Sequence, residues 1–345
     1  MKEDIENKFM KKNLRKKYQI LKNVDEEAAF ERFCNRVGVE VPKKRSAGFP
    51  VHWRRLACVA ASVAAIMVGI IVMRFDGGNA VMNVADIKHA GSCAYLTTES
   101  GASVDLDNSS QSIAIDGLLA QTTDGMLSVE DNGTAARNVI TVPRGGEYHV
   151  TLSDGTKVHL NAESSLEFPS HFNGNARKVK LTGEAYFDVV HVEDMPFLVE
   201  AGHAVVKQYG THYNVDAYNA ISVKVTLVEG SISVRTNNTG EHFIKSGQQA
   251  VVSHDAIGIK NVDVAKETGW NKGVFCFEDA NLADIASTLT RWYDMDIEVD
   301  KSLASLHFTG SLMRDDNLAD ILDAICELTG TTYEYNNGKI KLYRK

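Results

Sequence analysis

Residues 56–73 read LACVAASVAAIMVGIIVM and carry no charged side chain. A run of this length stands at the lower end of what an α-helix needs to cross about 30 Å of hydrocarbon. Arg54 and Arg55 directly precede the run, whereas Arg74 after it is soon followed by Asp76. Because Lys and Arg are enriched on the cytosolic side of a span, we expect a single-pass helix with a cytosolic N-terminus. The alternative is a buried core helix, for which so long an uncharged run is unusual.

The predicted span divides the charge of the chain very unevenly. The 345 residues carry a net charge of −8. Residues 1–55 hold 15 Lys and Arg against 8 Asp and Glu, a net charge of +7, so the remainder carries −15. We therefore expect a small basic piece in the cytosol and a large acidic piece outside it. Neither the overall charge nor any recognition motif indicates direct binding to nucleic acid.

Small side chains recur every four residues within the predicted span, at Ala57, Ala61, Ala65 and Gly69. A stripe of this kind lets a second transmembrane helix approach closely. Simple use of alanine in a modest membrane helix explains the pattern equally well.

The cytosolic segment, residues 1–55, has the pattern of two short helices. Its second half carries an apolar stripe formed by Ala29, Phe30, Phe33 and Val37. Fifty-five residues bury too little surface to be robust alone, so we expect this stripe to close on a partner. A small self-packed hairpin, or a basic segment held to anionic lipid headgroups, remains an alternative.

Residues 80–262 change to a period-two pattern with frequent turn signals. The stretch 149–161 reads as strand, Asp-Gly turn and strand, and the stretch 95–107 repeats that shape. A further strand–Glu-Gly–strand unit follows at 224–236. The inward positions expected in the first hairpin are Val150, Leu152, Val158 and Leu160. These features predict an all-β domain, a sandwich or short solenoid of stacked hairpins.

Residues 273–345 contain an internal repeat, because 281–299 aligns without a gap onto 317–335. Each copy begins with an asparagine, Asn281 or Asn317, which is a natural helix N-cap. Apolar residues follow at helical spacing, and strand-like segments flank each helix. The pattern predicts a compact α+β module of two β-α-β units.

Several motifs in order resemble the FecR family of transmembrane anti-sigma factors: TVPRGGEYHVTLSDGTKVHLNAESSLEFP, RKVKLTGEAYFDV, PFLVEAG, YGTHYNVDAY and VTLVEGSISV. The duplicated module is similar to the small domain that follows FecR in Bacteroidetes members, which is related to the short N-terminal domain of secretins and TonB-dependent transducers. The expected organisation is a sigma-factor-binding segment at 1–55, a transmembrane helix at 56–73, a linker and N-terminal β region at 74–139, a FecR-like β domain at 140–265 and the module at 273–345.

The resemblance implies an inner-membrane protein whose N-terminal segment holds an ECF-type sigma factor. Its periplasmic region would read the state of an outer-membrane TonB-dependent transducer, which in this group is often SusC-like. Release of the sigma factor would follow a conformational change or cleavage by proteases within or beside the membrane. The sequence leaves the identity of the sigma factor and of the transducer open.

Signatures of enzymes and cofactor sites are missing from the sequence, so we expect no catalytic activity, cofactor or metal. His149 and His159 could approach across one hairpin, but two histidines alone make a poor metal site. The sequence allows a disulfide between Cys276 and Cys326, but it favours two buried free thiols. It does not determine the state of Cys93. The competing function is that of a membrane-anchored glycan-binding protein, which would need exposed aromatic residues.

Overall fold

The computed structural model describes residues 84, 87–106, 109–208, 210–254 and 256–345. Among these residues, none of the helices is both long and apolar enough to span a bilayer. The predicted span with its stripe of small residues lies outside the described ranges. The same holds for the apolar stripe at Ala29, Phe30, Phe33 and Val37, which therefore stays a prediction.

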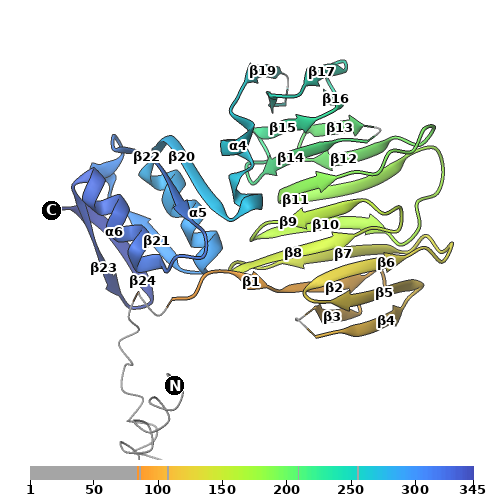
Figure 1. Ribbon diagram of the computed structural model, residues 1–345, viewed down its shortest axis with the longest axis horizontal. Coiled ribbons are helices and arrows are strands. Elements are labelled where there is room, and N and C mark those ends of the chain that lie inside the picture. Colours follow the sequence, from red (N-terminus) through yellow and green to blue (C-terminus); the bar gives the residue numbers. More distant parts are fainter. Residues whose placement is uncertain (1–83, 85–86, 107–108, 209, 255) are drawn as a thin grey trace, which may run out of the picture. The chain divides into compact units, whose positions relative to one another are not determined.

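Residues 91–261, here called the β domain, form two sheets (Figure 1). From edge to edge, the first sheet contains β3 (Ser103–Leu106), β2 (Ala94–Thr98), β7 (Arg137–Val142), β10 (Ser164–Pro169), β11 (Arg177–Asp188), β12 (Phe197–Ala201), β13 (Ala204–Gln208), β16 (Ser231–Arg235) and β17 (His242–Lys245). The second contains β4 (Gln111–Ile115), β5 (Leu118–Thr123), β6 (Met126–Glu130), β8 (Gly146–Thr151), β9 (Lys157–Leu160), β11 again, β14 (His212–Ala217), β15 (Val223–Glu229), β18 (Gln248–Val252) and β19 (Ile257–Asn261). The short β1 (Gly91–Ser92) pairs with the start of β8.

Strand β11 belongs to both sheets because its backbone turns at Gly183. Residues before this glycine pair with β10 and β12, and residues from it onward pair with β9 and β14. Gly183 has φ +83°, and a Cβ at this position would lie 2.7 Å from Ser164 Cα. Both facts require glycine here, since other residues rarely adopt that backbone conformation and the neighbouring chain leaves no space.

One apolar core fills the space between the two sheets and includes residues on both sides of residue 140. The hairpin predicted at 149–161 is confirmed as β8 and β9, and Asp154 and Gly155 lie in its turn. Its four expected inward residues, Val150, Leu152, Val158 and Leu160, are at most 1% exposed. Alternation of apolar and polar residues therefore identified the buried face correctly.

The strand–Glu-Gly–strand unit at 224–236 does not form a hairpin. Its strands, β15 and β16, do not pair with each other: β15 lies between β14 and β18, and β16 lies between β13 and β17. Gly230, with φ +100°, carries the chain from one sheet to the other. Periodicity located these strands, but it carried no information on which neighbours they pair with.

A short connection, α4 (Val264–Glu267) and the 3₁₀ turn η2 (Gly269–Lys272), leads to the C-terminal module. The module contains β20 (Val274–Asn281), α5 (Leu282–Tyr293), β21 (Asp296–Val299), η3 (Lys301–Leu303), β22 (His307–Met313), α6 (Leu318–Thr329), β23 (Thr331–Asn336) and β24 (Lys339–Arg344). Both predicted N-caps are confirmed, because Asn281 and Asn317 accept hydrogen bonds from Asp284 N and Asp320 N. The strands of each β-α-β unit belong to different sheets, since β20 pairs with β22 and β21 pairs with β24.

The module has an apolar core that is a separate cluster from that of the β domain, although Ala162 of the β domain contributes to it. The apolar stripes of α5 and α6 supply most of it, as their spacing predicted. Since each part buries its own core, the contact between them need not be apolar. Most of the polar contacts between the two parts lie at their junction, which is described next.

Candidate functional site

Arg314 of the module lies at the centre of the junction, and its side chain is only 3% exposed. Its guanidinium stands 3.4 Å from the centre of the Trp292 ring. Nη1 donates to the carbonyl of Trp270 at 2.8 Å, and Nη2 donates to Asn161 Oδ1 at 2.7 Å. Burial lowers the pKa of Arg314 to about 10, against the opposing effect of the Glu147 and Glu184 carboxylates, so the group stays charged at neutral pH.

The backbone around Arg314 is fixed by aromatic residues at the end of α5. Trp292 Nε1 donates to the carbonyl of Arg314 at 2.7 Å, and the Tyr293 hydroxyl donates to the carbonyl of Asp316 at 2.7 Å. The amide of Arg314 donates to the carbonyl of Gly273, which ends η2 in a left-handed conformation. Helix α5 therefore positions the arginine at the end of β22.

Half-buried Glu184 on β11 extends the site into the β domain. Its carboxylate accepts hydrogen bonds from Asn161 Nδ2 at 2.8 Å and from Asn214 Nδ2 at 2.9 Å. Asn214 Oδ1 in turn accepts from Trp270 Nε1 at 3.0 Å. Together with the two bonds of Arg314, these contacts close a ring of hydrogen bonds through Arg314, Asn161, Glu184, Asn214 and Trp270. Both parts of the chain contribute to this ring, which we call the polar latch.

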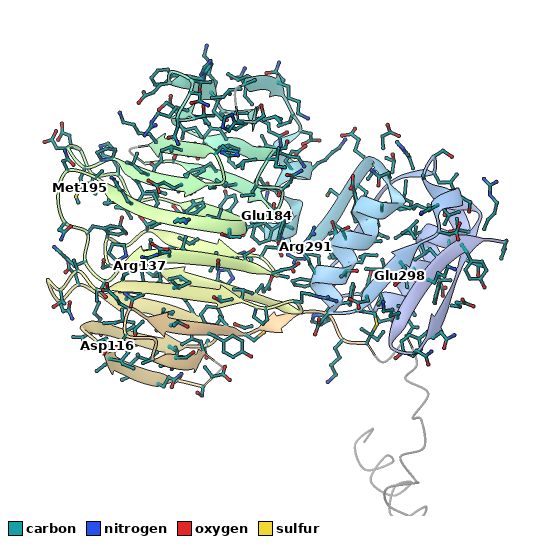
Figure 2. All side chains as sticks on the ribbon, turned by 180° about the vertical axis from the view of Figure 1, so that it is seen from behind. Asp116, Arg137, Glu184, Met195, Arg291 and Glu298 are labelled. Atoms are coloured by element: carbon teal, nitrogen blue, oxygen red, sulfur yellow. The ribbon has the colours of Figure 1, made fainter. Side chains whose placement is uncertain are left out.

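The environment of Glu184 favours its protonated form. Burial raises the pKa of Glu184 to about 7, and the neighbouring Asp216 carboxylate adds to the effect. The two asparagine amides and Arg314 act in the opposite direction. A carboxyl group that titrates near neutral pH thus lies within the polar latch. Figure 2 shows Glu184 and Arg291 at the junction, on β11 and α5 respectively.

A histidine pair flanks the polar latch on β8 and β9. His149 and His159 stack with ring centres 3.9 Å apart, as their expected positions across the hairpin predicted. His159 Nδ1 lies 2.6 Å from Asn271 Oδ1, and its Nε2 lies 3.4 Å from Glu147 Oε2. Burial and the neighbouring His159 lower the pKa of His149 to about 4, despite the opposing charge of Glu147. Within the described ranges, no three His, Cys, Asp or Glu residues are placed to hold a metal ion.

A second polar contact joins the turn before β8 to the end of α5. Arg144 Nε lies 3.1 Å from Asp294 Oδ1, and its Nη1 lies 3.0 Å from Asp296 Oδ1. The amide of Gly145 donates to the carbonyl of Arg291 at 2.7 Å. The guanidinium of Arg291 lies 4.0 Å from the centre of the Tyr218 ring. Both junction contacts therefore rely on arginines of one part and polar or aromatic groups of the other.

This arrangement suits reversible attachment better than catalysis. Intramolecular interfaces that open resemble transient protein–protein contacts, which are more polar than obligate ones. Here charged, amide and aromatic groups join two parts whose largest apolar clusters are separate. Water can hydrate such groups when the parts separate, which costs less than exposing a hydrophobic core.

Sequence reasoning missed most of the polar latch. Arg314 and Asn161 are 153 residues apart, and neither belongs to a known motif. One signal was present just before the two copies of the repeat: when their alignment is continued three residues towards the N-terminus, Arg314 corresponds to Glu278, so the charge at this position changes sign. Nor does any sequence pattern indicate that Arg144 contacts the carboxylates of Asp294 and Asp296.

Other sequence predictions have plain outcomes in the described residues. Cys93, Cys276 and Cys326 are free thiols, although Cys276 is half-buried and not fully buried as expected. Trp270 and Trp292 are 9% and 4% exposed, so neither offers the exposed aromatic platform that glycan binding would need.

Comparison with known proteins identifies families and solved structures that are similar to this chain. The family described as FecR protein matches residues 138–233, and the family described as FecR, C-terminal matches residues 274–342. A 1.65 Å crystal structure of a candidate anti-sigma factor from Parabacteroides distasonis is 31% identical, with a TM-score of 0.56, and the match covers 60% of this chain and 99% of that one. A 2.50 Å structure with the same description is 30% identical, with a TM-score of 0.56, and the match covers 61% and 99%. None of the curated proteins matches the chain.

The described residues form a β domain followed by a duplicated α+β module, and the family matches cover parts of both. The chain belongs to the FecR family, which is regulatory and not typically enzymatic. Its similarity to a candidate anti-sigma factor supports an anti-sigma role and implies a sigma factor as partner.

Proposed function

We propose that this protein is a single-pass inner-membrane anti-sigma factor that sequesters an ECF-type sigma factor through residues 1–55. Its β domain and module would stand in the periplasm and receive a signal from an outer-membrane TonB-dependent transducer. The observation that carries the proposal is the match of nearly the whole length of a candidate anti-sigma factor to this chain at 31% identity. The basic segment, uncharged run and acidic remainder agree with the proposed topology.

The polar latch suggests how the signal would travel. The transducer would bind the module and favour a state in which the junction is open. A ligand shifts such an equilibrium only if it binds the two states with different affinity. Opening would alter the chain near the membrane, and the cytosolic segment would then release the sigma factor, with or without cleavage by membrane or periplasmic proteases.

Co-purification tests the cytosolic half of the proposal. The full chain, tagged at its C-terminus, is solubilised from membranes of its native host, and bound proteins are identified by mass spectrometry. We expect an ECF-type sigma factor that is lost when Phe30 and Phe33 are both changed to Asp. The control is Phe243→Asp on β17, where the side chain is 68% exposed. Absence of any sigma factor, or equal recovery with all variants, would contradict the proposal.

A further inference from the structure

The first described residues of the chain lie in the core of the C-terminal module, not in that of the β domain. Val84, Ile87 and Ala90 are 7%, 5% and 5% exposed. They belong to the same buried cluster as Leu282, Trp292 and the other core residues of the module. Their spacing of three residues presents one apolar edge to the module, and the amide of Ile87 donates to the carbonyl of Val84.

The same segment then attaches to the β domain through its backbone. The amide of Gly91 donates to the carbonyl of Gly145 at 3.1 Å, and β1 pairs in parallel with β8. Between the two attachments, the ring of His89 stacks near Trp292, with centres 6.4 Å apart. The segment therefore crosses the junction, where it is bound by apolar side chains on one side and by main-chain hydrogen bonds on the other.

This crossing lies beside the polar latch. Trp292 touches both His89 and Arg314, and Ser92 of β1 is paired with Glu147, which faces Arg314. Gly145 accepts from Gly91 and donates to Arg291 of α5. Any movement that separates the module from the β domain must therefore remove one of the two attachments of the segment.

We propose that the module holds Val84 and residues 87–90, here called the strap, and that opening of the junction releases this strap from the module. Main-chain pairing at β1 stays with the β domain, whereas the apolar edge of the strap loses its cover. Since the predicted span ends at residue 73, the strap is the first described part of the chain beyond the span. This last step rests on the proposed function, because it requires the membrane topology proposed above.

Lys88 provides a built-in probe of the strap. Its side chain is exposed, but its neighbours Ile87 and Ala90 are buried, so a protease cannot extract the extended backbone that cleavage requires while the strap is held. Limited trypsin digestion of the full chain in detergent, with mass spectrometry of the fragment that begins at His89, measures strap release directly.

Two variants test the proposal with one matched control. Ile87→Asp places a charge in the module core and should raise the cleavage rate at Lys88 at least tenfold. Arg314→Met opens the polar latch without touching the strap and should raise the rate by a similar factor. The control, Ile221→Asp, makes the same chemical change where the side chain is 71% exposed and should leave the rate within twofold of wild type.

A second measurement distinguishes release of the strap from unfolding of the whole β domain. Amide hydrogen exchange at Leu181 on β11 should stay at its wild-type rate in all variants, which shows that the β domain is folded. Wild-type cleavage in Ile87→Asp, or in Arg314→Met, would overturn the proposal, as would equal acceleration at Leu181. The assay contains no sigma factor, so failure of the anti-sigma function would appear only in the co-purification experiment.

Discussion

Replacing Arg314 with methionine is the most informative single change at the junction. Methionine keeps an unbranched apolar stem over Trp292 but removes the guanidinium. The change deletes the hydrogen bonds to Trp270 O and Asn161 Oδ1 and leaves Glu147 without the cation 3.6 Å away. It also deletes the contact of the cation with the Trp292 ring.

The size of the effect follows from the burial of the two charges. Removing one partner of a buried ion pair costs about 3–5 kcal/mol, since the other charge is left uncompensated. The Glu147 side chain is 31% exposed, so water can hydrate part of its charge. We therefore expect the lower limit, about 3 kcal/mol of the free energy that joins the module to the β domain.

Tryptophan fluorescence during urea denaturation measures this loss. In a Trp53→Phe background only Trp270 and Trp292 report, and both lie in the site. With a slope of about 3 kcal/mol per M, the loss lowers the transition midpoint by about 1 M. The control is Arg137→Met, which removes an ion pair whose arginine is 62% exposed and should shift the midpoint very little. Equal shifts for the two variants would refute the assignment of Arg314 as the centre of the latch.

Three further predictions concern the β domain. In the folded wild-type protein Glu184 has a pKa of about 7, whereas the ordinary carboxyl pKa is 4.5. The free energy of unfolding should therefore fall as pH rises between these values. Denaturation measured across this pH range should show that Glu184→Gln abolishes the fall. His149, whose pKa is lowered from 6.5 to about 4, should contribute a rise in stability across that interval, which His149→Gln removes. Gly183→Ala should lower the melting temperature far more than Gly174→Ala. Both glycines have positive φ, so each substitution costs about 1–2 kcal/mol of backbone strain. Only at Gly183 would the added Cβ also clash with a neighbour, since nothing lies within 4 Å of a Cβ at Gly174.

The sequence predicted the elements whose information is local. Alternating apolar residues revealed the β8–β9 hairpin, and asparagine caps with helical stripes revealed α5 and α6. Each of these patterns repeats within about a dozen residues and reflects which face is buried. Strand partners were harder, as β15 and β16 demonstrate, because a glycine at the turn is compatible with either a hairpin or a crossing between sheets.

The polar latch could not be predicted because its members come together only after both parts have folded. Glu184 and Asn214 lie on β11 and β14, and Asn161 directly follows β9, whereas Arg314 belongs to the module. None has an unusual local pattern. The apolar residues of the strap are equally inconspicuous, since Val84, Ile87 and Ala90 show neither strand nor helix periodicity.

Inhibition of transcription in vitro tests the central claim most directly. The sigma factor recovered with the chain is combined with core RNA polymerase and its promoter, and the purified full-length chain is titrated in. The anti-sigma account predicts loss of transcript that is complete near one chain per sigma factor and absent for the Phe30→Asp, Phe33→Asp variant. Undiminished transcript at a large excess of the wild-type chain would contradict the account.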